Sequence, residues 1–159
     1  MPIKITFYGA AGEVTGSAYH IQTDQANVLL DFGMFQGGRK AENRNRVPRG
    51  LRPRKLDAVL VTHAHLDHTG RLPLLSKNGY TGPIYCTPAT AEVTGLILRD
   101  SAKVQAQDMA RTNRKRERAG LAPLSPLYGA EEVETLIRLL KDVPYNEPVP
   151  VAPGMRAKF

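Results

Sequence analysis

The stretch Thr62-His63-Ala64-His65-Leu66-Asp67-His68 contains three of the four histidines in a chain of 159 residues. It follows a run of apolar residues that is typical of a buried strand, and functional side chains of α/β layers gather where such strands end. Imidazole nitrogens and carboxylate oxygens are suitable ligands for Zn²⁺ and neighbouring divalent ions. We therefore predict a metal site in which His63 and His65 bind one ion. Asp67 and His68 can bind a second.

One alternative is a polar loop whose histidines only satisfy local hydrogen bonds. That interpretation suits a lone histidine, and we apply it to His20, which lies in strand-like sequence away from the motif. It does not suit three histidines and an aspartate within six residues. The glycine-rich segments offer no competing nucleotide site, because Ala11 interrupts the G-x-G-x-x-G pattern and Arg39 stands where a P-loop needs lysine.

The H-x-H-x-D-H motif resembles that of the metallo-β-lactamase fold, an α/β sandwich (αββα) with two sheets inside and helices outside. Two further segments, Phe7 to Ser17 and Leu29 to Gly37, resemble the opening of its β-CASP branch of RNA-processing nucleases. The basic helical segment from about Arg99 to Tyr128 resembles the RNA specificity factor group of bacterial hydrolases. The resemblance implies a zinc-dependent hydrolase of ribonuclease type.

The resemblance also implies a role for each residue of the site. His63 and His65 are ligands of the first of two zinc ions, and Asp67 and His68 are ligands of the second. Asp67 is in addition the catalytic residue that orients the attacking hydroxide. Asp31 follows another apolar strand and is expected to hold a ligand histidine in place rather than to bind metal. The alternative for Asp31 is an acid that only ends the strand.

In that family a later histidine, a bridging aspartate and a final histidine complete the site, yet no histidine follows His68. We therefore expect residues 1–159 to be the N-terminal half of the sandwich, without its second half and without the β-CASP domain. This half would include a basic loop at 39–55 and a helical insertion at about 88–142. An incomplete gene or a shortened form of a longer protein fits this pattern better than a small protein that has lost catalysis.

The positive charge of the chain is concentrated in one segment. The chain carries 22 Lys and Arg against 15 Asp and Glu, and the whole excess of +7 lies between Arg39 and Lys55. Such a concentration favours an anionic partner, RNA first, although a solvated loop that binds nothing is the alternative. A second basic run lies at Arg111 to Arg118. The RNA contacts that we predict are Arg39, Lys40, Arg44, Arg46, Arg114, Lys115 and Arg116.

Apolar and alternating stretches predict strands at 3–8, 17–23, 27–30, 56–62 and 82–86, with a short helix at 70–77. Thr87 and Pro88 predict the start of a long helix, and Gly120 predicts its end. The residues expected on the apolar face of this helix are Val93, Leu96, Ile97 and Val104. A second helix is expected at 131–141, with the apolar residues Val133, Leu136, Ile137 and Leu140. Without a partner sheet, some core residues should be partly uncovered, namely Val59, Leu60 and Val61.

Composition excludes several other classes of protein. Hydrophobic residues make up 42% and charged residues 23%, as in ordinary globular chains, and no apolar run approaches the roughly 18 residues that span a bilayer. The N-terminus does not have the pattern of a secretory signal. Cys86 is the single cysteine, so a cytoplasmic location is the simplest expectation. We expect RNA as the partner, no membrane, and a homodimer as one state of the full-length form.

Two other functions compete with the ribonuclease. One is a hydrolase of the same fold that acts on a small thioester, lactone or lactam. The other is a catalytically inactive RNA-binding module, which the missing downstream ligands would fit. The two basic runs favour the ribonuclease over the small-molecule hydrolase, because a small substrate does not require them. Exonuclease or endonuclease action, and RNA or DNA as the substrate, stay open at this stage.

Overall fold

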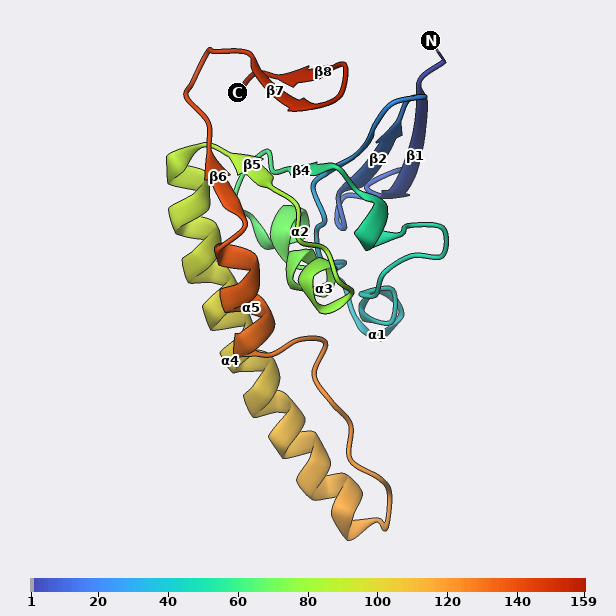
Figure 1. Ribbon diagram of the computed structural model, residues 1–159. Helices are drawn as coiled ribbons and strands as arrows, with labels where there is room; N and C mark the ends of the chain where they lie inside the picture. Colours follow the sequence, from blue (N-terminus) through green and yellow to red (C-terminus); the bar gives the residue numbers. More distant parts are fainter. Residues whose placement is uncertain (1) are drawn as a thin grey trace.

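A computed structural model describes residues 2–159 (Figure 1). Its centre is a six-stranded sheet in the order β1-β2-β3-β4-β5-β6. The β2 strand is antiparallel to both of its neighbours, and the pairs from β3 to β6 are parallel. The strands are β1 Lys4–Gly9, β2 Ala18–Gln22, β3 Asn27–Leu30, β4 Ala58–Leu60, β5 Ile84–Cys86 and β6 Leu140–Asp142.

Helices cover one face of this sheet. The long helix α4 runs along the side of the molecule, and its second half extends beyond the body together with the segment that returns to α5 (Figure 1). The helices are α1 Arg39–Glu42, α2 Leu66–Thr69, α3 Leu72–Lys77, α4 Pro88–Arg118 and α5 Ala130–Ile137, with a 3₁₀ turn η1 at Pro53–Lys55. No helix in the described range 2–159 is long and apolar enough to cross a bilayer.

The main core lies between the helices and the sheet. Leu29, Val59 and Ile84 are neighbours across β3, β4 and β5, and all are fully buried on the helix-covered face. Leu98 of α4 and Leu136 of α5 pack into the same cluster. Burying such a side chain fully contributes about 1.5–3 kcal/mol relative to exposure, so this face holds α4 and α5 to the sheet.

The other face of the sheet meets a hairpin of β7 (Val149–Ala152) and β8 (Met155–Ala157). Val151 packs against Val28 and Ala58, and Leu60 is partly covered there. The expectation that Val59 and Val61 would be partly uncovered is wrong, since both are fully buried. Alternation along β4 points Val59 to the helices, and Ala58 and Leu60 face the hairpin side.

The uncovered apolar surface lies instead on β1. Ile3, Ile5 and Phe7 are 65%, 51% and 59% exposed. Ile5 and Phe7 are alternate residues of β1, and Ile3 lies directly before it. Ile5 and Phe7 pair across to Ile21 and Tyr19 on the same face as the hairpin. The hairpin therefore covers the centre of this face and leaves its β1 edge open.

The long helix begins and ends where the sequence predicts, but its buried face differs. Thr87 caps it by accepting a hydrogen bond from Thr90 N, and Gly120 follows its end with a positive φ of 65°. The predicted apolar face is wrong for three residues, since Val93, Leu96 and Val104 are 44%, 68% and 47% exposed. The buried stripe is one of mostly smaller side chains at four-residue spacing, namely Thr90, Thr94, Leu98 and Ala102.

This rotation follows from the packing of α4 against α5. Arg99 of α4 donates two hydrogen bonds to the Glu134 carboxylate of α5, at 2.6 and 3.0 Å. The stripe of smaller residues faces inward, where α4 approaches α5 closely enough that a Cβ built on Gly95 would lie 3.6 Å from Ile137. A pattern of hydrophobicity alone does not contain this contact.

The second predicted helix is shorter than expected. It ends at Ile137, and Leu140 to Asp142 form β6 instead of the last helical turn. Leu140 pairs with Ile84 of β5, and Ile84 N donates to Leu139 O at 2.9 Å. Completing the sheet satisfies these backbone groups, whereas one more helical turn would leave β5 paired on one side only, with β4.

Candidate metal centre

The H-x-H-x-D-H motif connects β4 to α3 through the one-turn helix α2. His65 is the residue before α2, and its carbonyl oxygen accepts hydrogen bonds from His68 N at 2.9 Å and Thr69 N at 3.0 Å. The buried Thr69 hydroxyl donates to the carbonyls of Ala64 and His65 at 3.2 and 3.0 Å. These bonds close a tight turn, so Asp67 and His68 project from a fixed backbone next to His63 and His65.

A neighbouring segment clamps this turn from the other side. Ser17 N donates to Asp67 O, and Phe32 N donates to His68 O, both at 2.9 Å. Gly33 passes so close that a Cβ built on it would lie 1.5 Å from Asp67 O. Only glycine fits at this position, because any side chain would occupy the space of the Asp67 backbone.

We expect Gly33→Ala to destabilise the protein by about 3 kcal/mol or more, since the methyl group overlaps backbone and not a flexible side chain. Chemical denaturation followed by circular dichroism measures this free energy of unfolding. Gly38→Ala is the matched control in the same loop, because its Cβ would meet nothing within 4 Å, although its φ of 91° adds some strain. Equal destabilisation by the two substitutions would contradict the close approach at Gly33.

The four side chains of the motif converge as two pairs of donor atoms. His63 Nε2 lies 3.2 Å from His65 Nδ1, and His68 Nε2 lies 3.6 Å from Asp67 Oδ2. The rings of His63 and His68 are 4.0 Å apart between centroids. Two nitrogens bound to one tetrahedral zinc, each about 2.0–2.1 Å from the ion, lie roughly 3.3 Å apart. The histidine pair therefore fits a zinc ion, and the carboxylate pair fits with a small movement.

Two donors for each ion are fewer than a metal site usually has. Within residues 2–159 no group of three or more His, Cys, Asp or Glu side chains is arranged to hold one ion. His65 is exposed, and His63, Asp67 and His68 are partly exposed, so this cluster is open to further ligands. The described part of the chain thus supplies two donors for each of two ions, at the carboxyl ends of the parallel strands.

Asp31 is buried directly behind the ligand cluster. Its Oδ2 lies 2.7 Å from His68 Nδ1 and accepts from Ser17 Oγ at 3.2 Å, and its Oδ1 accepts from Thr62 N at 2.9 Å. The Thr62 hydroxyl also lies 2.9 Å from Asp31 Oδ2 and 3.0 Å from His63 Nδ1. A proton on His68 Nδ1 that is donated to Asp31 leaves Nε2 free with its lone pair.

Similarity to a known protein family agrees with this geometry. The family model described as the metallo-beta-lactamase superfamily matches residues 11–146. The chain belongs to the metallo-beta-lactamase superfamily. The resemblance that the motif indicates is therefore confirmed, and the α/β layers of sheet and helices agree with the fold class expected for it.

Two curated relatives carry RNA-related names. Ribonuclease TTHA0252 of Thermus thermophilus is 43% identical over 145 residues, covering 91% of this chain and 29% of that protein. Transcription termination factor FttA of Cenarchaeum symbiosum is 35% identical over 158 residues, covering 97% of this chain and 22% of that protein. The chain therefore spans less than a third of the length of these relatives. Among solved structures, the metallo-beta-lactamase fold protein YhfI from Bacillus subtilis is 19% identical with a TM-score of 0.48, covering 94% of this chain and 50% of that chain.

Divalent metal dependence is common to the superfamily, and the protonation state of His63 suits it. Burial, and then the neighbouring His68 and His65, lower the pKa of His63 below its ordinary value. A histidine with a lowered pKa is neutral at pH 7, which is the form that binds metal.

We expect Asp31→Asn to keep most of the metal in a form of this superfamily member that is extended to the length of its relatives. Activity should fall by about 10–100-fold, since an amide cannot accept the His68 proton and Thr62 contacts as a carboxylate does. Metal analysis and initial rates on the same preparation separate the two effects. Ser17→Ala removes only one hydrogen bond to Asp31 and should have the smaller effect. If Asp31→Ala removes metal as completely as loss of two histidines, Asp31 is itself a ligand.

The predicted RNA contacts lie in two separate regions. Lys40 and Arg46 are exposed in the loop, whereas Arg44 donates two hydrogen bonds to the Glu13 carboxylate at 2.6 and 2.7 Å. Arg114 and Lys115 are exposed on the far half of α4, and Arg116 donates to Ala122 O at 2.7 Å. The side chain of Arg39 lies outside the described residues. Arg44 is thus less free to bind RNA than the sequence suggests.

His20 does not join the cluster. It lies on β2, is 6% exposed, and stacks on Tyr8 with 6.3 Å between ring centroids. Burial, and then the charge of Lys4, lower the pKa of His20, so the ring is neutral at pH 7. Its position between two strands agrees with a structural role, which stays a prediction.

The structure adds residues that sequence reasoning missed. Thr62 and Ser17 donate hydrogen bonds to Asp31. Gly33 leaves room for the backbone of the motif turn, and Arg71 binds the loops behind it. Arg71 is 1% exposed, and its guanidinium donates to the carbonyls of Gly33 and, at 3.2 Å, Gly16. Its place directly after the motif was a signal for such a role, whereas Ser17 gave none.

Proposed function

We propose that this chain carries the metal-binding half of a metal-dependent ribonuclease that cleaves RNA phosphodiesters. The observation that carries the proposal is the pair of donor sets at one sheet edge, His63 with His65 and Asp67 with His68, next to a buried carboxylate. The names of the relatives, ribonuclease and transcription termination factor, support RNA as the substrate class. So does the +7 charge that is concentrated in residues 39–55.

The proposed mechanism assigns a task to each residue. Two zinc ions would supply Lewis acidity and a water of lowered pKa near neutral pH. His63 and His65 would hold one ion and His68 the other. Asp67 would bind the second ion with one oxygen and orient the attacking water with the other, because a carboxylate accepts at both oxygens. Asp31 would keep His68 in the tautomer that binds metal.

RNA and the remaining expectations belong to the whole protein. The proposed RNA contacts are the exposed cations of the basic loop and of the far half of α4. A homodimer of the full-length form, a cytoplasmic location and the division of residues 1–159 as an N-terminal half stay predictions.

Substrate competition tests the proposed function. A form extended to the length of the relatives is incubated with labelled single-stranded RNA, and separately with a thioester, a lactone and a lactam, each with zinc and with chelator. We expect chelator-sensitive cleavage of RNA and little turnover of the small substrates, and His68→Ala should abolish the RNA cleavage. Faster turnover of a small substrate than of RNA would identify a small-molecule hydrolase instead.

A further inference from the structure

A pocket of about 660 Å³ opens where β1 ends. Phe7, Tyr8 and Gly9 line it from the strand, and Glu13 lines it from the following turn. The basic loop supplies Arg44, Arg46 and Arg49, and Arg71 supplies part of the wall. We call this the arginine pocket. Its volume lies in the range of small-molecule sites, roughly 300–1,000 Å³.

The positive charge of the arginine pocket exceeds its negative charge. Glu13 is the one acid of its lining, and Arg44 pairs with it at 2.6 Å. The hydrogen bond from Arg44 lowers the pKa of the Glu13 carboxyl, so that pair is neutral overall at pH 7. Burial lowers the pKa of Arg71 to about 10, which still leaves it protonated. Its partners are backbone carbonyls, so its charge is not neutralised.

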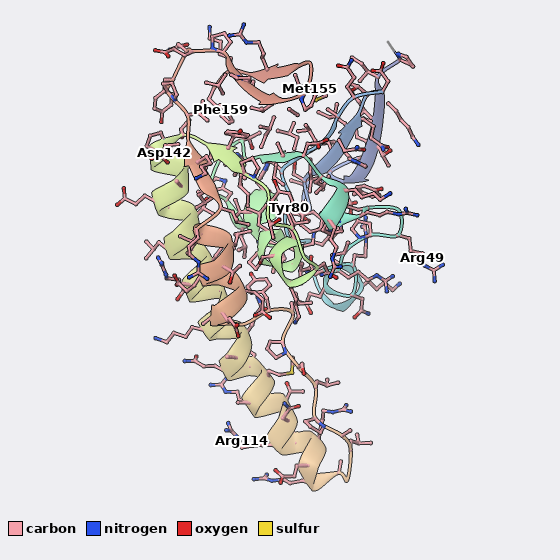
Figure 2. All side chains as sticks on the ribbon, viewed as in Figure 1. Arg49, Tyr80, Arg114, Asp142, Met155 and Phe159 are labelled. Atoms are coloured by element: carbon pink, nitrogen blue, oxygen red, sulfur yellow. The ribbon has the colours of Figure 1, made fainter. Side chains whose placement is uncertain are left out.

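Two further arginines of the pocket are available to an anion. Arg46 and Arg49 are exposed, and their side chains make no ion pair or hydrogen bond in the described part of the chain. Figure 2 shows Arg49 extending away from the loop. Guanidinium groups bind phosphate oxygens through two parallel hydrogen bonds, so these two side chains suit a phosphodiester.

An aromatic ring stands beside these cations. Phe7 is 59% exposed, and its ring makes a T-shaped contact with Tyr19 at 5.4 Å between centroids. The other phenylalanine of the lining, Phe35, is already covered by the Arg44 guanidinium at 3.9 Å. More than half of Phe7 is therefore open to solvent and available for stacking, which is how proteins hold unpaired RNA bases.

The arginine pocket lies at the same end of the strands as the metal centre. Since β1, β3 and β4 run in one direction, their carboxyl ends meet at this edge. Three strand spacings separate β1 from β4, which is roughly 14 Å at about 4.8 Å each. Arg71 also joins the two places, because it donates to Gly33 O and Gly33 abuts the Asp67 backbone.

We propose that the arginine pocket binds one nucleotide of single-stranded RNA, with its base stacked on Phe7 and its phosphate on Arg46 and Arg49. This inference rests on the proposed function and names the place where the RNA strand is held beside the metal centre. The basic run on the far half of α4 also carries positive charge, but within residues 2–159 no aromatic ring lies beside its arginines, so it does not fit a nucleotide in this way.

Binding of a fluorescent eight-nucleotide RNA to the 159-residue chain, in chelator and over a range of salt, tests the proposal without cleavage. Arg46→Ala/Arg49→Ala should weaken binding about tenfold or more and reduce the log–log salt slope by about 1.4, or roughly 0.7 for each lost phosphate contact. Phe7→Ala should weaken binding on the order of tenfold without changing the slope. Phe7→Trp should keep the affinity, because it keeps the stacking face.

The matched control is Lys141→Ala/Lys158→Ala, which removes two exposed charges outside both basic runs and should leave affinity and slope near those of the wild type. Arg114→Ala/Lys115→Ala is the competing variant on α4. Thermal melting of each variant excludes unfolding as a cause, and Phe7→Trp gives a second folded comparison. If the α4 variant loses affinity and the pocket variants do not, the pocket assignment is wrong and RNA binding itself stands. Loss in the arginine variant with Phe7→Ala unchanged would overturn the nucleotide assignment. No binding by the wild type would overturn both the pocket and the RNA partner.

Discussion

Residues 1–159 alone are expected to cleave labelled RNA at least about 10³-fold more slowly than a form extended to the length of the relatives. The reason is coordination. Each ion would have two protein donors, one pair from His63 and His65 and one from Asp67 and His68. A catalytic zinc usually has three protein ligands and a water, and the described residues supply no group of three.

An ion held by two donors is bound weakly and can shift position, so an attacking water would not be held in line with the phosphorus. Misplacement by about 1 Å can cost 10²-fold in rate, and partial occupancy lowers the rate further. The open β1 edge adds a second effect, since exposed Ile3, Ile5 and Phe7 form an apolar patch that favours association between molecules. A low rate therefore has to be measured on monomeric protein.

The measurement is a matched pair of proteins, the 159-residue chain and the extended form, on the same RNA with added zinc and with chelator. Size-exclusion chromatography before each assay removes aggregates, and the extended His68→Ala variant sets the background rate. Chelator-sensitive cleavage by the shorter chain at a rate near that of the extended form would show that four motif residues suffice. The view of residues 1–159 as half of a site would then fail.

The motif predicted the location of the candidate site because its chemistry is local. Three histidines and an aspartate within six residues, after an apolar strand, can only converge if the chain turns at once, and α2 is that turn. Asp31 was predictable for a similar reason. It ends β3, which is parallel to β4, so both strand ends meet at one edge. The backbone of Asp31 has a φ of 57°, in the left-handed region that aspartate tolerates.

Contacts between distant segments were not predictable in the same way. The buried face of α4 depends on its packing against α5 and the sheet, most of which is distant from it in the sequence. The end of α5 is decided by the pairing of β6 with the free side of β5. Hydrophobic periodicity describes one element at a time, so both contacts lie outside it. The engagement of Arg44 with Glu13, 31 residues away, is a third case and changes which basic residues are free.

Removing one histidine should empty one metal position and leave the other. In an extended form, we expect two zinc ions per chain in the wild type and about one in both His63→Ala and His68→Ala. The donor atoms divide between the two pairs, with 3.2 Å between His63 and His65 and 3.6 Å between His68 and Asp67. Losing His63 should therefore leave the Asp67–His68 pair, together with the Asp31 contact that orients it.

Elemental analysis of dialysed, monomeric protein gives the zinc content of each variant. His20→Gln is the matched control, because it changes a histidine that lies on β2 outside the cluster, and it should keep two ions if melting shows it folded. Loss of both ions from either single variant would mean that the two sites are so interdependent that one cannot form alone. Unchanged zinc content in both His63→Ala and His68→Ala would show that the motif does not bind the metal. The proposed hydrolytic chemistry would then have no metal position in the described chain, since within residues 2–159 no group of three or more such donors is arranged to hold an ion.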